Sequence, residues 1–261
     1  MGALVVAEGG TFTPPGAGDF DLPPIFLGIT KPMILIALSV IVIAAFFLIS
    51  TRKLKVVPGK GQFIAEYLYD FARNGMAREQ IGSKDFKPFI PLVLTLFTFV
   101  LVNNLFGMLP FFQFPTFAHI GFPIALSLLV VYPVYHYVGF KRHGFVGYIK
   151  HATMPPGAPL AIYFLLTPIE FLQKFVLNPL TLAVRVFAAM FAGHLILLVF
   201  TVAGEFLLTQ ASGFIAKPVS IVSFAFAILM TFVEVLIQVI QAYVFAVLSA
   251  NYIGAALAED H

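Results

Sequence analysis

Long uncharged apolar runs, separated by short polar segments, dominate the pattern of this chain. The first run covers Pro32 to Ser50, which is 19 residues without a charge, and a cluster of basic residues follows it. A helix of that length crosses about 30 Å of hydrocarbon at 1.5 Å per residue. Similar runs cover Ile90 to Leu109 and Phe122 to Phe140. The pattern therefore predicts membrane-crossing helices over about residues 31–51, 89–110 and 120–140.

The segment from Lys60 to Asp85 follows a different pattern. Its apolar and aromatic residues recur at helical spacing and are interleaved with acidic and basic residues such as Glu66 and Arg73. This predicts an amphipathic helix over about residues 61–80 that lies on the membrane surface. Residues 1–30, rich in Gly, Pro and Asp, are expected to form an irregular polar N-terminal segment, and residues 259–261 a short tail.

Two apolar stretches near the C-terminus, about 160–209 and 213–258, are too long for one upright span each. Fifty residues of helix would measure about 75 Å. Each stretch is therefore either one tilted or bent helix or two shorter spans, and periodicity leaves both possibilities open. Pro168 and Pro179 are positioned to bend the first stretch. With about five membrane-crossing helices and one surface helix, residues 31–258 are expected to form a single transmembrane domain.

Composition supports an all-α integral membrane protein. The chain is 60% hydrophobic and only 10% charged, whereas a soluble domain carries about 25% charged residues. So few charges cannot cover a water-facing surface. The absence of Cys excludes disulfides, thiol catalysis and Cys-based metal clusters. The basic residues lie in loops between apolar runs, which indicates topology and not a nucleic-acid patch, so no nucleic-acid partner is expected. No cofactor is expected either.

The distribution of basic residues predicts the orientation of the chain. Eleven of its 15 Lys and Arg residues lie in the connections that follow the first and third upright spans, whereas Lys31 and Lys217 fall on the opposite side. The positive-inside rule then places the N-terminus outside and the C-terminus in the cytoplasm, provided that the last two stretches cross once each. The eleven residues are Arg52, Lys53, Lys55, Lys60, Arg73, Arg78, Lys84, Lys87, Lys141, Arg142 and Lys150.

Ionisable residues at membrane depth are costly, and they gather in the last third of this chain. Lys174 precedes Arg185 by 11 residues, which returns a regular helix to nearly the same face. Glu170 is four residues before Lys174, a spacing that favours an ion pair. Arg185 is surrounded in sequence by Ala and Gly residues, which let another helix approach closely. Because arginine effectively never deprotonates, its expected use is as a fixed charge.

A second polar track is expected on the other side of the same helix. His194 follows Arg185 by nine residues and so points to the opposite face. On the last stretch Glu234, Gln238 and Gln241 share one face, where Glu234 is placed to meet His194. Titratable groups lined by amides suit a proton path, because histidine and carboxylate pass protons on and amides hold water.

These residues also have purely structural interpretations. Arg185 could pair with Glu170 or Glu205, and Lys174 could simply offset Glu170. His194 could be a packing histidine, and Glu234 a protonated core acid. The remaining histidines of the central region are expected at interfaces or in loops; they are His119, His136, His143 and His151.

Several segments resemble subunit a of F-type ATP synthases. The segment Asn178 to His194, NPLTLAVRVFAAMFAGH, is similar to the block around that family's essential arginine. The segment Gln238 to Phe245, QVIQAYVF, is similar to the block on its last helix, and Thr167 to Glu170 and Asn104 to Pro110 are further similar stretches. The resemblance covers most of residues 30–258.

The resemblance implies a proton-translocating stator subunit that is not itself an enzyme. Such a subunit offers two aqueous half-channels to a rotating ring of c subunits, and its last two helices form a long tilted hairpin against that ring. The implied partners are the c-ring, b-type peripheral stalk subunits and the lipid bilayer, and the implied location is the bacterial plasma membrane. Carried over by position, Arg185 matches the arginine that prevents a proton short circuit, and Gln241 matches a glutamine of the last helix.

His194 and Glu234 match a coupled pair that lines the periplasmic half-channel of the family. The order of acid and base is reversed relative to many bacterial members, and Ala189 stands where many of them carry Asn. The other residues expected to take part in proton translocation are Gln238, Asn103, Asn104, Glu170 and Lys174.

Two other classes of membrane protein compete with this interpretation. A proton-coupled secondary transporter would often show an inverted internal repeat, and none is visible. A haem-binding subunit needs histidines that face each other within paired spans, whereas His194 is the only histidine deep in a long stretch.

Overall fold

The computed structural model of the chain describes residues 12–20, 22–25, 28–109, 112–154, 160–211 and 214–258. The first part of the predicted N-terminal segment, residues 1–11, and the tail, residues 259–261, lie outside these ranges. Within the described ranges five helices are long and apolar enough to cross a membrane. They are Lys31–Thr51, Lys87–Met108, Gly121–Thr153, Ile162–Thr209 and Ala216–Leu257. The all-helical fold class predicted from the sequence is therefore confirmed.

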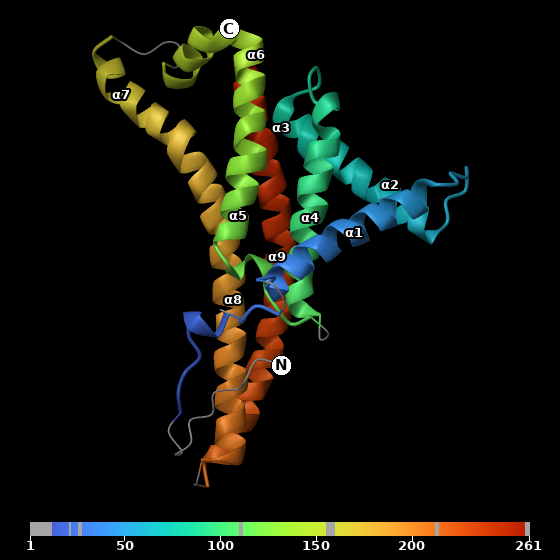
Figure 1. Ribbon diagram of the computed structural model, residues 1–261, viewed down its shortest axis with the longest axis vertical. Coiled ribbons are helices and arrows are strands. Elements are labelled where there is room, and N and C mark those ends of the chain that lie inside the picture. Colours follow the sequence, from blue (N-terminus) through green and yellow to red (C-terminus); the bar gives the residue numbers. More distant parts are fainter. Residues whose placement is uncertain are drawn as a thin grey trace.

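The first two helices lean away from the remainder of the molecule (Figure 1). Helix α1 spans Lys31–Thr51 and begins with Pro32 in its first turn, where a missing N–H costs nothing. The predicted amphipathic segment forms α2, Lys60–Ala72, a π-helical turn η2, Arg73–Arg78, and the short α3, Glu79–Ile81. Several of its apolar side chains, including Phe63 at 60% exposure, face outward, as expected for an element that rests on lipid.

The third span is longer than the sequence pattern indicated. After α4, Ile90–Met108, the chain forms α5, Gly121–Ala125, a π-helical segment η5, Leu126–Val131, and α6, Tyr132–Thr153. The helix expected to end near residue 140 thus continues to Thr153, with a break at Gly144, whose φ is 72°. Short 3-10 turns also occur at Ala17–Phe20, Lys87–Phe89 and Thr116–Ala118.

The open question about the two long stretches is settled in favour of one bent helix and one continuous helix. The first consists of α7, Leu160–Leu172, the π-helical turn η6, Gln173–Leu177, and α8, Asn178–Thr209. Pro168 lies inside α7, and Pro179 occupies the first turn of α8. The bend between α7 and α8 is visible in Figure 1. The second stretch is the 42-residue α9, Ala216–Leu257.

Helices α8 and α9 run side by side and form a long hairpin (Figure 1). Two serines of α9 tie it to the backbone of α8: Ser220 donates to the carbonyl of Gly204 at 2.7 Å, and Ser223 to that of Phe200 at 2.7 Å. Serine hydroxyls that bond across helices are a common device where no water is present to satisfy them. The expected hairpin of two long helices is therefore present.

The core of the molecule lies around the C-terminal half of α9. There Ala242, Phe245, Ala246, Ala250 and Ile253 are all completely buried. Helices α4, α6 and α8 pack around this segment, and the small alanines let their backbones come close. This packing fixes α9 relative to α4 and α8, which carry the candidate functional residues.

Candidate functional site

A buried ion pair between α8 and α9 forms the centre of the site. His194 Nδ1 contacts Glu234 Oε1, and both residues are buried, with 8% and 1% of their surfaces exposed. The same Nδ1 lies 3.2 Å from the carbonyl oxygen of Met190, one turn earlier on α8. Both contacts of the ring are therefore made through Nδ1, whereas Nε2 is buried and has no hydrogen-bond partner in the described part of the chain.

Amide side chains extend this pair along α9 and onto α4. The Nε2 of Gln238 donates to Glu234 Oε1 at 3.3 Å and lies 3.1 Å from the sulfur of Met190. Asn104 on α4 donates through Nδ2 to the backbone carbonyl of Gln238 at 3.0 Å. Gln241 is also buried, one turn further along the same face of α9. The face predicted from the spacing of Glu234, Gln238 and Gln241 is therefore the buried one.

Asn103 connects this region to α1. Its Nδ2 donates to Ser39 Oγ at 2.9 Å and to the carbonyl of Phe99 at 2.8 Å. Ser39 in turn donates to the carbonyl of Ile36. We refer to the six side chains that carry this arrangement as the buried polar cluster: Asn103, Asn104, His194, Glu234, Gln238 and Gln241.

The buried polar cluster holds more hydrogen-bonding capacity than its own members use. Within the described part of the chain, five of its buried atoms have no protein hydrogen-bond partner. Buried polar groups are normally paired because leaving one unpaired costs free energy. A buried cluster that retains both free acceptors and a free donor is suited to bind water or exchange protons. The atoms are Asn103 Oδ1, Asn104 Oδ1, His194 Nε2, Glu234 Oε2 and Gln241 Nε2.

Two glycines make room for the ion pair. A methyl group at Gly107 of α4 would lie 2.6 Å from His194 Nε2, and one at Gly193 of α8 would lie 2.8 Å from Glu234 Oε1. Real side chains do not tolerate such distances, so any larger residue at either position would displace the pair. Gly107 was not singled out in the sequence, although it follows Asn103 by one helical turn and so shares its face. Gly193 was noted only as a small residue near Arg185.

Arg185 lies on the other side of α8. It is exposed, whereas His194 is buried, which agrees with the opposite faces predicted from their spacing. Ala188 and Ala192 are also exposed and follow Arg185 at helical spacing, so the surface beside the guanidinium is shallow. This small-residue face suits the close approach of another helix.

The Arg185 region also has a neighbour that sequence reasoning missed. Tyr252 of α9 lies near Thr181 and Arg185 of α8. Its ring also lies 5.7 Å from that of Tyr135 on α6. The sequence carries no signal for this contact, because it depends on how α9 passes between α6 and α8.

Glu170 and Lys174 form a separate pair. Their side chains are 3.2 Å apart, as the four-residue spacing predicted. Lys174 Nζ also donates to the carbonyl of Ala152 on α6 at 2.7 Å, and Tyr135 donates to the carbonyl of Lys174 at 2.9 Å. The π-helical turn η6 contains Lys174, so the uniform 100° per residue used to place it on the face of Arg185 does not hold across this segment. These contacts give the pair a structural role between α7 and α6.

One histidine differs from expectation. His136, expected at an interface or in a loop, lies within α6 and is only 5% exposed. Its Nδ1 is 2.9 Å from the hydroxyl of Tyr148, and its ring stacks on that of Phe175 at 4.7 Å. Aromatic residues at helical spacing along α6 were present in the sequence, but their convergence on His136 depends on the break at Gly144. Among the described residues there is no group of three or more His, Cys, Asp or Glu that could hold a metal ion.

Comparison with known proteins identifies the family. The model of the ATP synthase A chain family matches residues 33–254. The chain is 45% identical to ATP synthase subunit a of Nocardioides sp., over 98% of this chain and 96% of that protein. It is 43% identical to the subunit a of Pseudarthrobacter chlorophenolicus, over 99% and 98%, and 42% identical to that of Streptomyces lividans, over 98% and 92%.

The chain therefore belongs to the ATP synthase subunit a family. It is the proton-translocating stator subunit of an F-type ATP synthase, a multi-pass membrane protein of the Fo sector that has no catalytic activity of its own. This excludes the secondary transporter and the haem-binding subunit that remained open from the sequence.

Proposed function

We propose that the buried polar cluster lines one proton half-channel and that Arg185 separates it from a second one. The observation that carries this proposal is the division of α8 into two faces, with His194 buried against Glu234 on one side and Arg185 exposed on the other. A proton that reaches the ring must leave the first path before it meets the second. A cation that never deprotonates interrupts any continuous chain of proton carriers between them.

The exposed face of α8 around Arg185 is proposed to contact the rotating c-ring. Ala188 and Ala192 keep that face shallow, so a ring helix can bring its carboxyl group close to the guanidinium. A nearby positive charge favours the ionised form of such a carboxyl group. The protonated carboxyl group thus releases its proton as it approaches Arg185, and the resulting carboxylate takes up another proton from the half-channel that contains His194 and Glu234.

The two remaining residues of the predicted set take a different role in this proposal. Glu170 and Lys174 bond to each other and to α6, so they support the bend between α7 and α8 and do not line a half-channel. The b-type stalk subunits are a further proposed partner. The proposed orientation, in a bacterial plasma membrane, has the N-terminus outside and the C-terminus in the cytoplasm.

The test is the substitution Arg185→Ala in the assembled synthase. ATP-driven proton pumping in inverted membrane vesicles is expected to fall to background, while the subunit still co-purifies with the c-ring. Lys217→Ala is the matched control, because Lys217 is an exposed cation at the start of α9. Normal pumping by Arg185→Ala would disprove the proposed barrier, and loss of pumping in the control would show that the assay reports general damage.

A further inference from the structure

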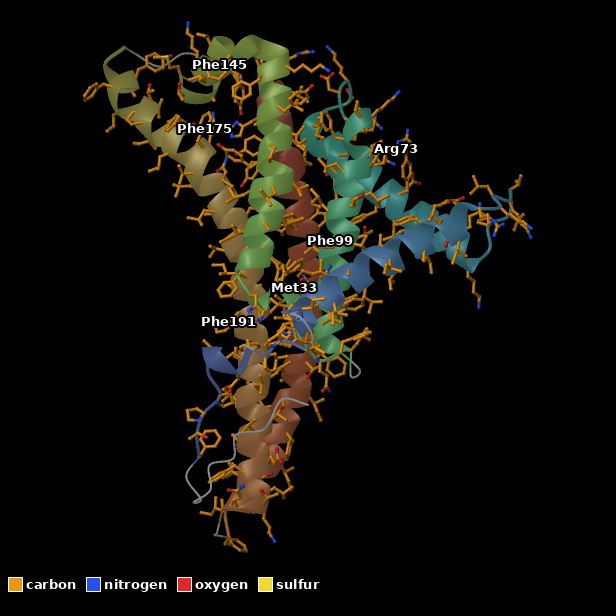
Figure 2. The ribbon with its side chains drawn as sticks, viewed as in Figure 1. Met33, Arg73, Phe99, Phe145, Phe175 and Phe191 are labelled. Atoms are coloured by element: carbon orange, nitrogen blue, oxygen red, sulfur yellow. The ribbon has the colours of Figure 1, made fainter. Side chains whose placement is uncertain are left out.

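Two π-helical turns lie along the contact between the third span and the bent helix formed by α7 and α8. One is η5, Leu126–Val131, which joins α5 to α6, and the other is η6, Gln173–Leu177, which joins α7 to α8. Phe175 lies on the side of η6 toward α6 (Figure 2), and its ring stacks on that of His136 at 4.7 Å. Single π-helical turns inside α-helices are frequently found at functional sites. Neither turn contains a residue of the buried polar cluster.

Two hydroxyl groups of the third span bond to the backbone of the bent helix. Ser127 Oγ donates to the carbonyl of Pro179 at 2.7 Å, and the hydroxyl of Tyr135 donates to the carbonyl of Lys174 at 2.9 Å. Both donors are buried, with 0% and 3% of their surfaces exposed. Hydrogen bonds are electrostatically stronger in such surroundings than in water. The two bonds therefore attach the start of α8 to the third span.

The carbonyl of Lys174 depends on Tyr135 because the helix supplies no donor to it at the usual positions. The backbone N–H of Asn178, four residues later, donates to Gln173 across the π-helical turn. Pro179, five residues later, has no N–H. A buried carbonyl without a partner costs free energy. The Tyr135 hydroxyl therefore takes the place of a missing backbone donor and stabilises η6.

The turn η5 brings the two donors onto one face of their helix. Ser127 and Tyr135 are eight residues apart, which would separate them by about 80° around a regular helix. The additional residue in η5 reduces this separation to about 20°. In the same way η6 reduces the separation of Lys174 and Pro179 from about 140° to about 40°. The two turns thus match each other, since each aligns one half of the same pair of hydrogen bonds.

Arg185 follows this attachment closely along α8. It lies six residues after Pro179, which is less than two helical turns. The ring of Tyr135 also lies 5.7 Å from that of Tyr252, which is near Arg185. The additional residue of η6 turns α8, and Arg185 with it, by about 100° relative to a regular continuation of α7. The hydrogen bond that stabilises η6 therefore helps to set the direction of Arg185.

We propose that Ser127 and Tyr135 are positioning residues for Arg185. Their hydroxyls hold η6 and the first turns of α8 against the third span, so that the guanidinium stays directed away from the buried polar cluster. Each hydrogen bond favours this arrangement by about fivefold, the usual net contribution of such a bond. The inference rests on the proposed function, because the direction of Arg185 matters for coupling only if it acts as the barrier.

The functional test is the double substitution Ser127→Ala with Tyr135→Phe in the assembled synthase. Both changes remove only a hydroxyl group, and the ring of residue 135 stays in place. We expect the ratio of protons pumped to ATP hydrolysed in inverted vesicles to fall at least about fivefold, because Arg185 is no longer held in one direction. Tyr148→Phe is the matched control, since that hydroxyl bonds to His136 within the same span. Its ratio should equal that of the unmodified synthase.

A distance measurement tests the positioning without the ring. Because the chain contains no Cys, pairs of introduced cysteines can carry spin labels in the full chain in nanodiscs. Ala188→Cys with Val222→Cys reports the start of α8, and Ile196→Cys with Val222→Cys reports a later, equally exposed part of α8 as the control. In the double variant the distribution of distances from position 188 should broaden, whereas that from position 196 should keep its width.

Two results would overturn the positioning role. An unchanged distribution from position 188 would show that the hydroxyls do not hold α8, and a lower yield of synthase with an unchanged pumping ratio would show that they serve assembly alone. Tyr135→Phe by itself should show both effects to a smaller extent, and it decides the result if the double variant does not assemble. Failure of the proposed barrier is read separately, from normal pumping by Arg185→Ala, and it leaves the distance result intact.

Discussion

At the scale of single residues, His194 and Glu234 form a buried acid–base pair whose members are each dependent on the other. Removing one partner of a buried pair leaves an uncompensated polar group and costs about 3–5 kcal/mol. The single change His194→Glu leaves two carboxyl groups in contact, and the single change Glu234→His leaves two imidazoles in contact. The pair is surrounded by Met190, Gln238 and the two glycines at 107 and 193. Exchanging the acid and the base leaves all four of these residues unchanged.

The exchange His194→Glu with Glu234→His is therefore expected to restore function. ATP-driven proton pumping of the double variant should exceed that of both single variants, since one acid and one base are again in contact. A double-mutant cycle on pumping rates measures the coupling between the two sites. If the double variant pumps no better than the poorer single variant, the two residues do not act as a unit.

At the residue scale, the sequence predicted correctly the features that depend only on the helical repeat of 3.6 residues. The spacing of His194 from Arg185 placed them on opposite faces of α8, and the structure has one buried and the other exposed. The contact of Gly107 with His194 could not be found in this way. It depends on how closely α4 approaches α8, and a single helix period carries no information about distances between helices.

At the scale of elements, the bend between α7 and α8 is supported by one lysine. Lys174 Nζ links Glu170 of α7 to the carbonyl of Ala152 on α6. Pro168 removes a backbone donor within α7. The side-chain contacts of Lys174 therefore fix the direction in which α7 leaves α8.

The substitution Lys174→Met is expected to loosen α7 from the C-terminal part of α6. It removes a charged hydrogen bond, a loss of about 1–3 kcal/mol in stability, and keeps the length and most of the volume of the side chain. Thermal unfolding of the purified chain in nanodiscs should show a lower midpoint. Glu170→Gln is the matched control, because it removes the ion pair and keeps the bond from Lys174 to Ala152. Equal effects of the two changes would show that the link to α6 contributes nothing.

The elements themselves were predictable where apolar runs have clear ends. Helix α1 was expected over 31–51 and spans Lys31–Thr51. The π-helical turn Gln173–Leu177 was not predicted, because one additional residue per turn leaves no mark in the alternation of apolar and polar positions. The extension of α6 to Thr153 was missed for another reason. Its second part is basic and follows a glycine, a pattern that also fits a loop.

At the scale of the whole molecule, the structure places several of the basic segments toward one end, and the connection between α1 and α2 projects to the side (Figure 1). In Figure 1 the turn at the end of α6, α3 and the C-terminal end of α9 lie toward the top, and the connection between α8 and α9 lies at the bottom. Among the described residues five helices are long and apolar enough to cross a membrane, and an odd number of crossings would place Lys31 and Leu257 on opposite sides. The positive-inside rule then predicts that the end of the molecule with Lys141, Arg142 and Lys150 is cytoplasmic.

The orientation can be tested with single cysteines, because the chain contains none. Lys150→Cys in the last turn of α6 and Lys217→Cys at the start of α9 replace exposed side chains at opposite ends of the molecule. A membrane-impermeant maleimide should label position 217 in protoplasts, whose plasma membrane is intact, and position 150 only in inverted vesicles. Labelling of both variants after detergent treatment shows that each thiol is reactive. The reverse pattern would mean that the end with more Lys and Arg faces outward and would contradict the predicted orientation.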